Sequence, residues 1–173
     1  MKSNHPGRLL IICPLADIYS GVGNFGAPPL GPWRLAHFLR QNGQEIDVWD
    51  CNVSESLRLP APDEHVGRDR AAALAEAFVA AIEKDHDLAK YDWIGFSLLN
   101  DTLSSSLGVI NLLRQKYPGK RLVGGNHEAT VNLNDCLNKS QLDGVVLADA
   151  EEPMLALMQG KPPHEVPGVV WRT

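Results

Sequence analysis

Short aliphatic segments alternate along this chain with segments whose apolar residues recur every three or four positions, and this alternation constrains the fold more than any other feature. Strand-like patterns occupy residues 8–13, 45–50, 92–98, 120–123, 143–147 and 168–171. Helix-like patterns occupy residues 33–42, 69–89, 107–117, 134–139 and 151–159. Because strands joined by helices pair in parallel with right-handed crossovers, the pattern predicts an α/β fold. We expect a Rossmann-like (flavodoxin-like), mainly parallel sheet of five or six strands with helices on both faces.

The length of 173 residues favours a single domain over residues 1–173, with a polar, proline-containing surface excursion at about residues 53–68. Lysine and arginine number 16 against 21 aspartate and glutamate, so the net charge is −5. This balance argues against a nucleic-acid partner, because such proteins normally present a basic face. No uncharged apolar run approaches the roughly 18 residues of a membrane span, and the first residues lack the apolar stretch of a signal peptide. We therefore expect neither nucleic acid nor membrane among the partners.

The three cysteines, Cys13, Cys51 and Cys136, are widely separated and lack the spacing of zinc ligands. An odd number of scattered cysteines fits the reducing cytoplasm, which is the location that we expect. No Cys-x-x-x-Cys-x-x-Cys run is present, so we expect no iron–sulfur cluster on this chain. Neither a Ser-His-Asp order nor a nucleophile elbow can be read, and the sequence assigns no catalytic residue and no metal ligand.

In the flavodoxin-like strand order, the loops after the first and third strands flank the point where ligands bind. The first of these loops contains Gly21, Gly23 and Gly26 in the spacing G-x-G-x-x-G. These glycines do not directly follow the strand, and Pro28-Pro29 separates them from the next helix. A dinucleotide fingerprint requires both junctions to be direct, so a nicotinamide-dependent oxidoreductase is disfavoured although Asp50 ends the second strand as a ribose ligand would. A loop that needs positive φ or a close approach to a bulky group is the simpler interpretation.

Hydroxyl side chains cluster after the third strand, at Ser97, Thr102 and residues 104–106. A helix N-cap requires only one of them, so we expect the others to bind a polar ligand or its phosphate. The fourth strand ends in a glycine pair, followed by Asn126, His127 and Glu128. A tight turn with a solvated histidine is the simpler interpretation there, because adjacent residues at a rigid strand end seldom chelate one metal ion.

Four segments in order give the chain a resemblance to a known family. They are residues 28–50 (PPLGPWRLAHFLRQNGQEIDVWD), residues 94–102 (IGFSLLNDT), residues 122–130 (LVGGNHEAT), and residues 143–160 with the VPGVVWR that follows. Together they resemble the cobalamin-binding domain of cobalamin-dependent radical S-adenosylmethionine enzymes, over nearly the whole chain.

Two departures from the family pattern are visible. The last loop of the family commonly reads Gly-Glu-Gly-Glu-Glu, whereas this chain has alanine in place of both glycines, at Ala148 and Ala150. An added Cβ restricts how closely a backbone can approach a ligand. The first loop carries no histidine beside Asp17, unlike cobalamin-dependent methyltransferases of the other type, and this is usual in the radical-enzyme group.

The resemblance implies a corrin ring over the carboxyl ends of the strands, with its nucleotide tail between the loops after the third and fourth strands. Ser97 and Thr102 would hydrogen-bond the tail, and Gly124 and Gly125 would allow its approach. Residues 15–26 would cover the lower corrin face, giving base-off cobalamin with no histidine ligand to cobalt. The candidate cofactor-binding residues are Leu15, Asp17, Tyr19, Gly21, Gly26, Ser97, Leu98, Thr102, Gly124, Gly125, Asn126, Ala148 and Glu151.

The function implied by the resemblance is that of the methyl carrier in a cobalamin-dependent radical S-adenosylmethionine methyltransferase. Its partner would be a radical domain that carries an iron–sulfur cluster, in the same enzyme or in trans, and no enzyme activity is assigned to this chain alone. The alternative is a flavodoxin-like regulatory or interaction module without cobalamin. That alternative explains the fold and the missing glycines, but it explains neither residues 28–31 nor the hydroxyl cluster.

Overall fold

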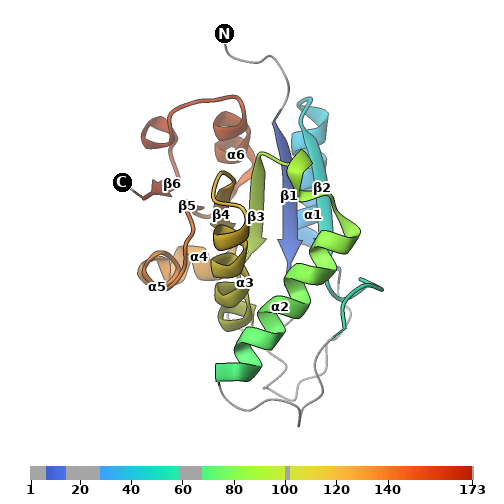
Figure 1. Ribbon diagram of the computed structural model, residues 1–173. Coiled ribbons are helices and arrows are strands. Elements are labelled where there is room, and N and C mark those ends of the chain that lie inside the picture. The colour runs from blue at the N-terminus through green and yellow to red at the C-terminus, as the bar shows by residue number, and fades with distance from the viewer. Residues whose placement is uncertain (1–6, 15–27, 59–67, 100–101, 173) are drawn as a thin grey trace.

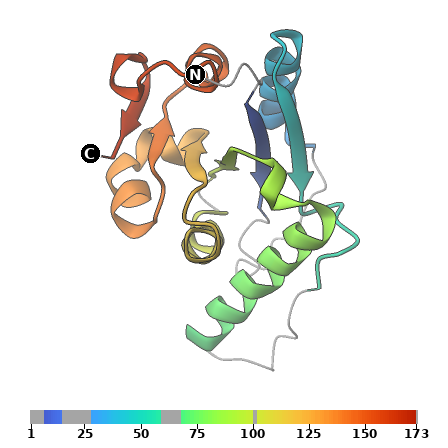
Figure 2. The same ribbon diagram turned by 45° about the horizontal axis from the view of Figure 1, so that its top comes forward.

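The computed structural model describes residues 7–14, 28–58, 68–99 and 102–172. These residues form one sheet of six strands in the order β2-β1-β3-β4-β5-β6, which Figure 2 shows from β2 (teal) to β6 (red). The strands are β1 (Arg8–Cys13), β2 (Glu45–Asp50), β3 (Trp93–Ser97), β4 (Arg121–Gly125), β5 (Gly144–Val146) and β6 (Val169–Trp171). The first five strands are parallel, and β6 pairs antiparallel with β5. The predicted Rossmann-like, mainly parallel sheet is therefore confirmed.

Helices connect the strands, close to the predicted positions. They are α1 (Leu30–Gln41), α2 (Arg68–Asp85), α3 (Leu103–Lys116), α4 (His127–Val131), α5 (Leu133–Lys139) and α6 (Glu151–Met158), with short 3-10 helices η2 (Leu88–Lys90) and η4 (Pro163–Glu165). Helix α1 begins earlier than predicted and includes Pro32 in its first turn. Proline is tolerated there because a backbone N–H in the first turn has no partner within the helix, so its absence breaks no hydrogen bond. Helix α4 was not expected from the sequence, and Asn126 initiates it by accepting a hydrogen bond from the His127 backbone N–H.

The helices cover both faces of the sheet, as the alternation of strands and helices predicts. In Figure 1, α2 and α3 lie in front of the sheet and α1 lies behind it. Successive strand residues point to opposite faces, so neighbours in β1 enter different cores. The core under α1 and α6 contains Leu9, Ile11, Ala36, Leu39, Val123, Val146, Met154 and Leu157. The core under α2 and α3 contains Leu10, Ile12, Phe78, Ile82, Ile94, Ile110, Leu113, Leu122 and Val145.

The last strand closes one edge of the sheet. Gly144 of β5 lies directly beneath Trp171, since a Cβ at Gly144 would come within 2.5 Å of a Trp171 ring carbon. The indole of Trp171 also packs edge-to-face on Trp93, with ring centroids 6.1 Å apart. Among the helices of the described residues, none combines the length and the apolar character that crossing a membrane requires.

Candidate functional site

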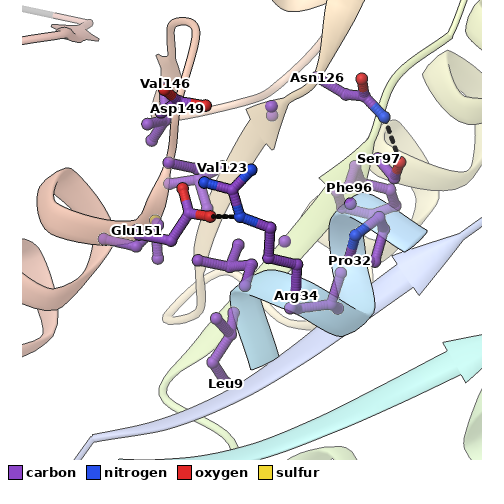
Figure 3. A pocket seen from close by; sticks show the side chains of 18 of the residues that line it. Leu9, Pro32, Arg34, Phe96, Ser97, Val123, Asn126, Val146, Asp149 and Glu151 are labelled. Carbon is purple, nitrogen blue, oxygen red and sulfur yellow. Dashed lines mark hydrogen bonds and ion pairs between the residues drawn. The ribbon is translucent and has the colours of Figure 1, made fainter. Parts of the chain in front are cut away.

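A groove of about 230 Å³ lies on the face of the sheet that α1 and α6 cover. Strands β1, β3, β4 and β5 form its floor, and the first turns of α1 and α6 form its two walls. Figure 3 shows the groove from close by, with Val123 and Phe96 on the strands and Arg34 reaching across toward Glu151. The groove opens where the parallel strands end, which is where ligands bind in open α/β sheets.

The floor of the groove is deep because small residues face it. Ser97 of β3 lies beside Gly125 of β4, and Gly95 lies beside Val123. A Cβ added to Gly125 would meet only the backbone oxygen of Val146, at 3.8 Å, so open space lies above this glycine. A Cβ on Gly95 would make ordinary contact with Leu9 Cδ1 at 3.4 Å. The missing side chains at 95 and 125 therefore leave room for a flat apolar group.

Gly124 contributes to the groove through its backbone, but the space beside it belongs to the opposite core. A Cβ at this position would lie 2.8 Å from Leu98 Cδ1 and 2.9 Å from Leu142 Cδ1. Both leucines are almost fully buried in the core under α2 and α3. Core packing thus requires glycine at position 124, and the approach of a ligand to its backbone stays a prediction. Leu98 also faces away from the groove.

The hydroxyl cluster divides into two groups. Thr102 Oγ1 accepts a hydrogen bond from the Leu99 N–H at 2.9 Å and donates to the Leu99 carbonyl at 3.1 Å. Ser105 and Ser106 donate to the Thr102 carbonyl, at 2.9 and 2.6 Å. These groups stabilise the start of α3, and Thr102 is not among the groove-lining residues. The hydroxyls of Thr102, Ser105 and Ser106 are thus occupied by bonds within their own turn, although none of them caps an N–H of α3, whereas Ser97 does line the groove.

Strained backbone conformations gather at the groove. Asn126 (φ 80°) and Ala148 (φ 54°) are the non-glycine residues with positive φ among those described, and both line it. Asn126 is held by donating from Nδ2 to Ser97 Oγ at 3.0 Å and by accepting at Oδ1 from the His127 N–H at 2.8 Å. The Ala148 N–H donates to Thr130 Oγ1 at 3.1 Å. Such strain costs about 1–3 kcal/mol per residue and is concentrated at functional sites in proteins generally.

Replacing Ala148 with glycine is expected to stabilise the fold by about 0.5–1 kcal/mol, because glycine adopts the left-handed conformation without a Cβ penalty. Ala156 is the matched control: it lies inside helix α6, where glycine is less favourable than alanine, so glycine there should lower stability instead. Urea unfolding of the two variants checks this. Equal destabilisation by both substitutions would contradict the argument.

Charged side chains lie only at the rim of the groove, within the described part of its lining. They are Arg34, Asp149 and Glu151, and Arg34 Nε lies 2.7 Å from Glu151 Oε1. Neither histidine nor cysteine lines the groove among the described residues. Cys13 ends β1 nearby, but burial and the charge of Asp50 raise the pKa of its thiol to about 12, so no thiolate is available there. The described floor of the groove is therefore apolar and backbone, with charge confined to its rim.

The structure brings together some of the predicted site residues. Ser97, Gly124, Gly125, Asn126, Ala148 and Glu151 line the groove, whereas Leu98 and Thr102 do not. Leu15, Asp17, Tyr19, Gly21 and Gly26 lie outside the described residues, as does most of the predicted surface excursion. Sequence reasoning missed Gly95, although a glycine inside an apolar strand often marks a close approach to a ligand or backbone. It also missed Arg34, which has no local signature.

Comparison with known proteins adds an independent finding. The family model described as a B12 binding domain matches residues 18–158. The matched segment contains α1, α6 and strands β2 to β5, and therefore all described groove residues except those of β1. No curated protein matched the sequence.

Proposed function

The chain belongs to the family of B12-binding domains, and we propose that it carries the cobalamin of a cobalamin-dependent radical S-adenosylmethionine methyltransferase. The observation that carries the proposal is the groove between α1 and α6, with Gly95 and Gly125 in its floor. The four ordered segments of the sequence support the association with radical enzymes. When bound, cobalamin supplies a cobalt that accepts a methyl group and passes it on.

The groove fits the end of the nucleotide tail of cobalamin, which is a flat bicyclic base. An apolar cavity of about 150 Å³ is large enough for benzene, and this groove has about 230 Å³. Its floor is uncharged, and Ser97 offers one polar contact. Ser97 Oγ accepts a hydrogen bond from Asn126 and retains its own proton, which it can donate to a ring nitrogen. A base held in this groove cannot coordinate cobalt, so we propose base-off binding.

The iron–sulfur cluster of the reaction would come from a separate radical domain, in the same enzyme or in trans. This chain would bind and orient the cofactor and leave the upper face open to that domain. The alternative, an interaction module without cobalamin, drew its support from the alanines that replace two glycines. Ala148 adopts φ 54° all the same, and Ala150 has φ −93°, which needs no glycine. The last loop thus adopts a glycine-like conformation at 148 without glycine, which supports the proposal.

Titration with cob(II)alamin tests the proposal. We expect a change in visible absorbance that saturates. We also expect the electron paramagnetic resonance lines of bound cob(II)alamin to lack the triplet splitting that a nitrogen ligand causes, because the base is in the groove and no histidine of this chain binds cobalt. His127 is the closest histidine in sequence to the groove residues, and it is exposed at the start of α4.

The control for this experiment is His127→Ala, which should bind cobalamin with the same spectrum as the wild type. No spectral change at saturating cobalamin, in protein that is folded by circular dichroism, would refute the proposed function. Triplet splitting that disappears in His127→Ala would instead identify a histidine ligand and overturn the proposed cofactor geometry.

A separate experiment tests the proposal that the radical chemistry comes from a partner domain and not from this chain. The chain alone, treated with iron and sulfide and then reduced, should not convert S-adenosylmethionine to 5′-deoxyadenosine, because its cysteines form no cluster motif. Product above a control without protein would show that a separate radical domain is not needed.

A further inference from the structure

One ion pair spans the groove and joins its two walls. Arg34 extends from α1, Glu151 stands at the start of α6, and their Nε and Oε1 atoms are 2.7 Å apart. Figure 3 shows the Arg34 side chain lying across the opening, between Glu151 on one side and Pro32 and Ser97 on the other. An elongated group that entered between the two walls would pass this pair.

A second hollow lies on the outer side of the same pair. It has a volume of about 440 Å³ between α1 and α6, and it includes His37, Phe38, Gln41, Glu152 and Pro153 in its lining. Arg34, Asp149 and Glu151 line both hollows. The ion pair therefore stands at the boundary between the groove and the outer hollow, so that its opening would join them.

The two side chains of the ion pair differ in how far they are exposed to solvent. The side chain of Arg34 is 72% exposed and that of Glu151 is 16% exposed. Glu151 also lies in the first turn of α6, where the helix dipole favours a carboxylate. An ion pair with one largely exposed partner is weak, so Arg34 can leave it at little cost. Arg34 is thus the partner that moves.

The charges of the rim decide what Arg34 does when a tail is bound. Among the described residues of the groove, Arg34 is the one cation, and Asp149 and Glu151 are carboxylates. A phosphodiester brought to this rim would be repelled by both carboxylates. A guanidinium binds phosphate oxygens through paired N–H donors, which makes Arg34 the group that can compensate.

We propose that Arg34 is a switch that selects corrinoids with a complete nucleotide tail. It pairs with Glu151 when the groove is empty and with the phosphodiester of the tail when the groove is filled. The inference rests on the proposed function and names the ligand class of the same site. Corrinoids that lack the nucleotide and its phosphate, such as cobinamide, gain nothing from Arg34.

Affinities for cobalamin and for cobinamide, measured by absorbance titration of wild type and variants, test the switch. Arg34→Gln should weaken cobalamin binding about tenfold, through loss of a charge-assisted hydrogen bond. Glu151→Gln should strengthen it about threefold, because the competitor for Arg34 is removed. Arg34→Lys should fall between the wild type and Arg34→Gln, because lysine keeps the charge and loses the paired donors. Cobinamide binding should change less than about twofold in each variant.

Glu152→Gln is the matched control, since Glu152 lies beside Glu151 but does not line the groove. It should leave both affinities unchanged, and thermal unfolding should show that all variants are folded. Tighter cobalamin binding in both Arg34→Gln and Glu151→Gln would mean that the ion pair only obstructs the groove and that Arg34 does not bind the phosphodiester. This result would overturn the switch. Unchanged affinities in both variants would overturn it as well. Failure of the wild type to bind cobalamin at all would overturn the proposed function itself.

Discussion

Gly125→Val is expected to lower the affinity for cobalamin at least about a hundredfold, equivalent to about 2.7 kcal/mol, with little change in the free energy of unfolding. The Cβ at this position meets only the Val146 backbone oxygen, at 3.8 Å, so a side chain can start here without a clash in the folded chain. Gly125 is the last residue of a strand and its φ is not positive, so a β-branched residue is tolerated. The two methyl groups of valine would then occupy the space that the nucleotide tail needs.

Absorbance titration with cobalamin and urea unfolding measure the two effects of this substitution. Gly125→Ala is the graded control, and it should weaken binding less than valine does. Equal losses of binding and stability in Gly125→Val would show that the glycine is required by the fold alone. Undiminished binding would show that the tail does not lie in this groove.

Gly124→Ala is expected to have the opposite outcome. Its Cβ would lie 2.8 Å from Leu98 Cδ1 and 2.9 Å from Leu142 Cδ1, in a core that has no spare room. Overpacking of this kind costs about 1–3 kcal/mol of stability. The methyl group points away from the groove, so folded Gly124→Ala should bind cobalamin within about threefold of the wild type.

Urea unfolding and the same titration, at a temperature where the variant is folded, provide the measurement for Gly124→Ala. Unchanged stability combined with abolished binding would place the Gly124 side-chain direction on the groove side and contradict the assignment of faces. Two adjacent glycines of one strand thus offer separate tests of fold and site, because successive residues of a strand face opposite sides of the sheet.

The general fold was predictable from local patterns. The run RLLIIC at residues 8–13 predicted a buried strand, and the structure buries five of the six residues of β1. The order of strands and helices then placed the ends of β3 and β4 at one edge of the sheet. Ser97 was noticed among the hydroxyls after the third strand, whereas Gly125 and Asn126 entered the candidate site through the family resemblance, and all three lie at the carboxyl ends of parallel strands.

Packing between distant segments was not predictable from the same patterns. The hydroxyls around Thr102 read as a ligand site, yet their partners are carbonyls of the same turn. The sequence suggested one role for Gly124 and Gly125 together. In the structure a side chain at Gly124 would enter the core under α2 and α3, whereas one at Gly125 would enter the groove. The geometry of α4 and the antiparallel pairing of β6 likewise depend on contacts that no short segment contains.

The periodicity of this chain was sufficient for its strands, its helices and hence its α/β layers, because those follow from interactions among near neighbours in sequence, and the strand order was expected from the general rules of such folds. The groove itself is a property of the folded chain: it exists where α1 and α6 diverge over Gly95 and Gly125. The Arg34–Glu151 pair that spans it joins the first helix to the last. Such contacts between distant segments form only when the sheet has brought the two helices to one face.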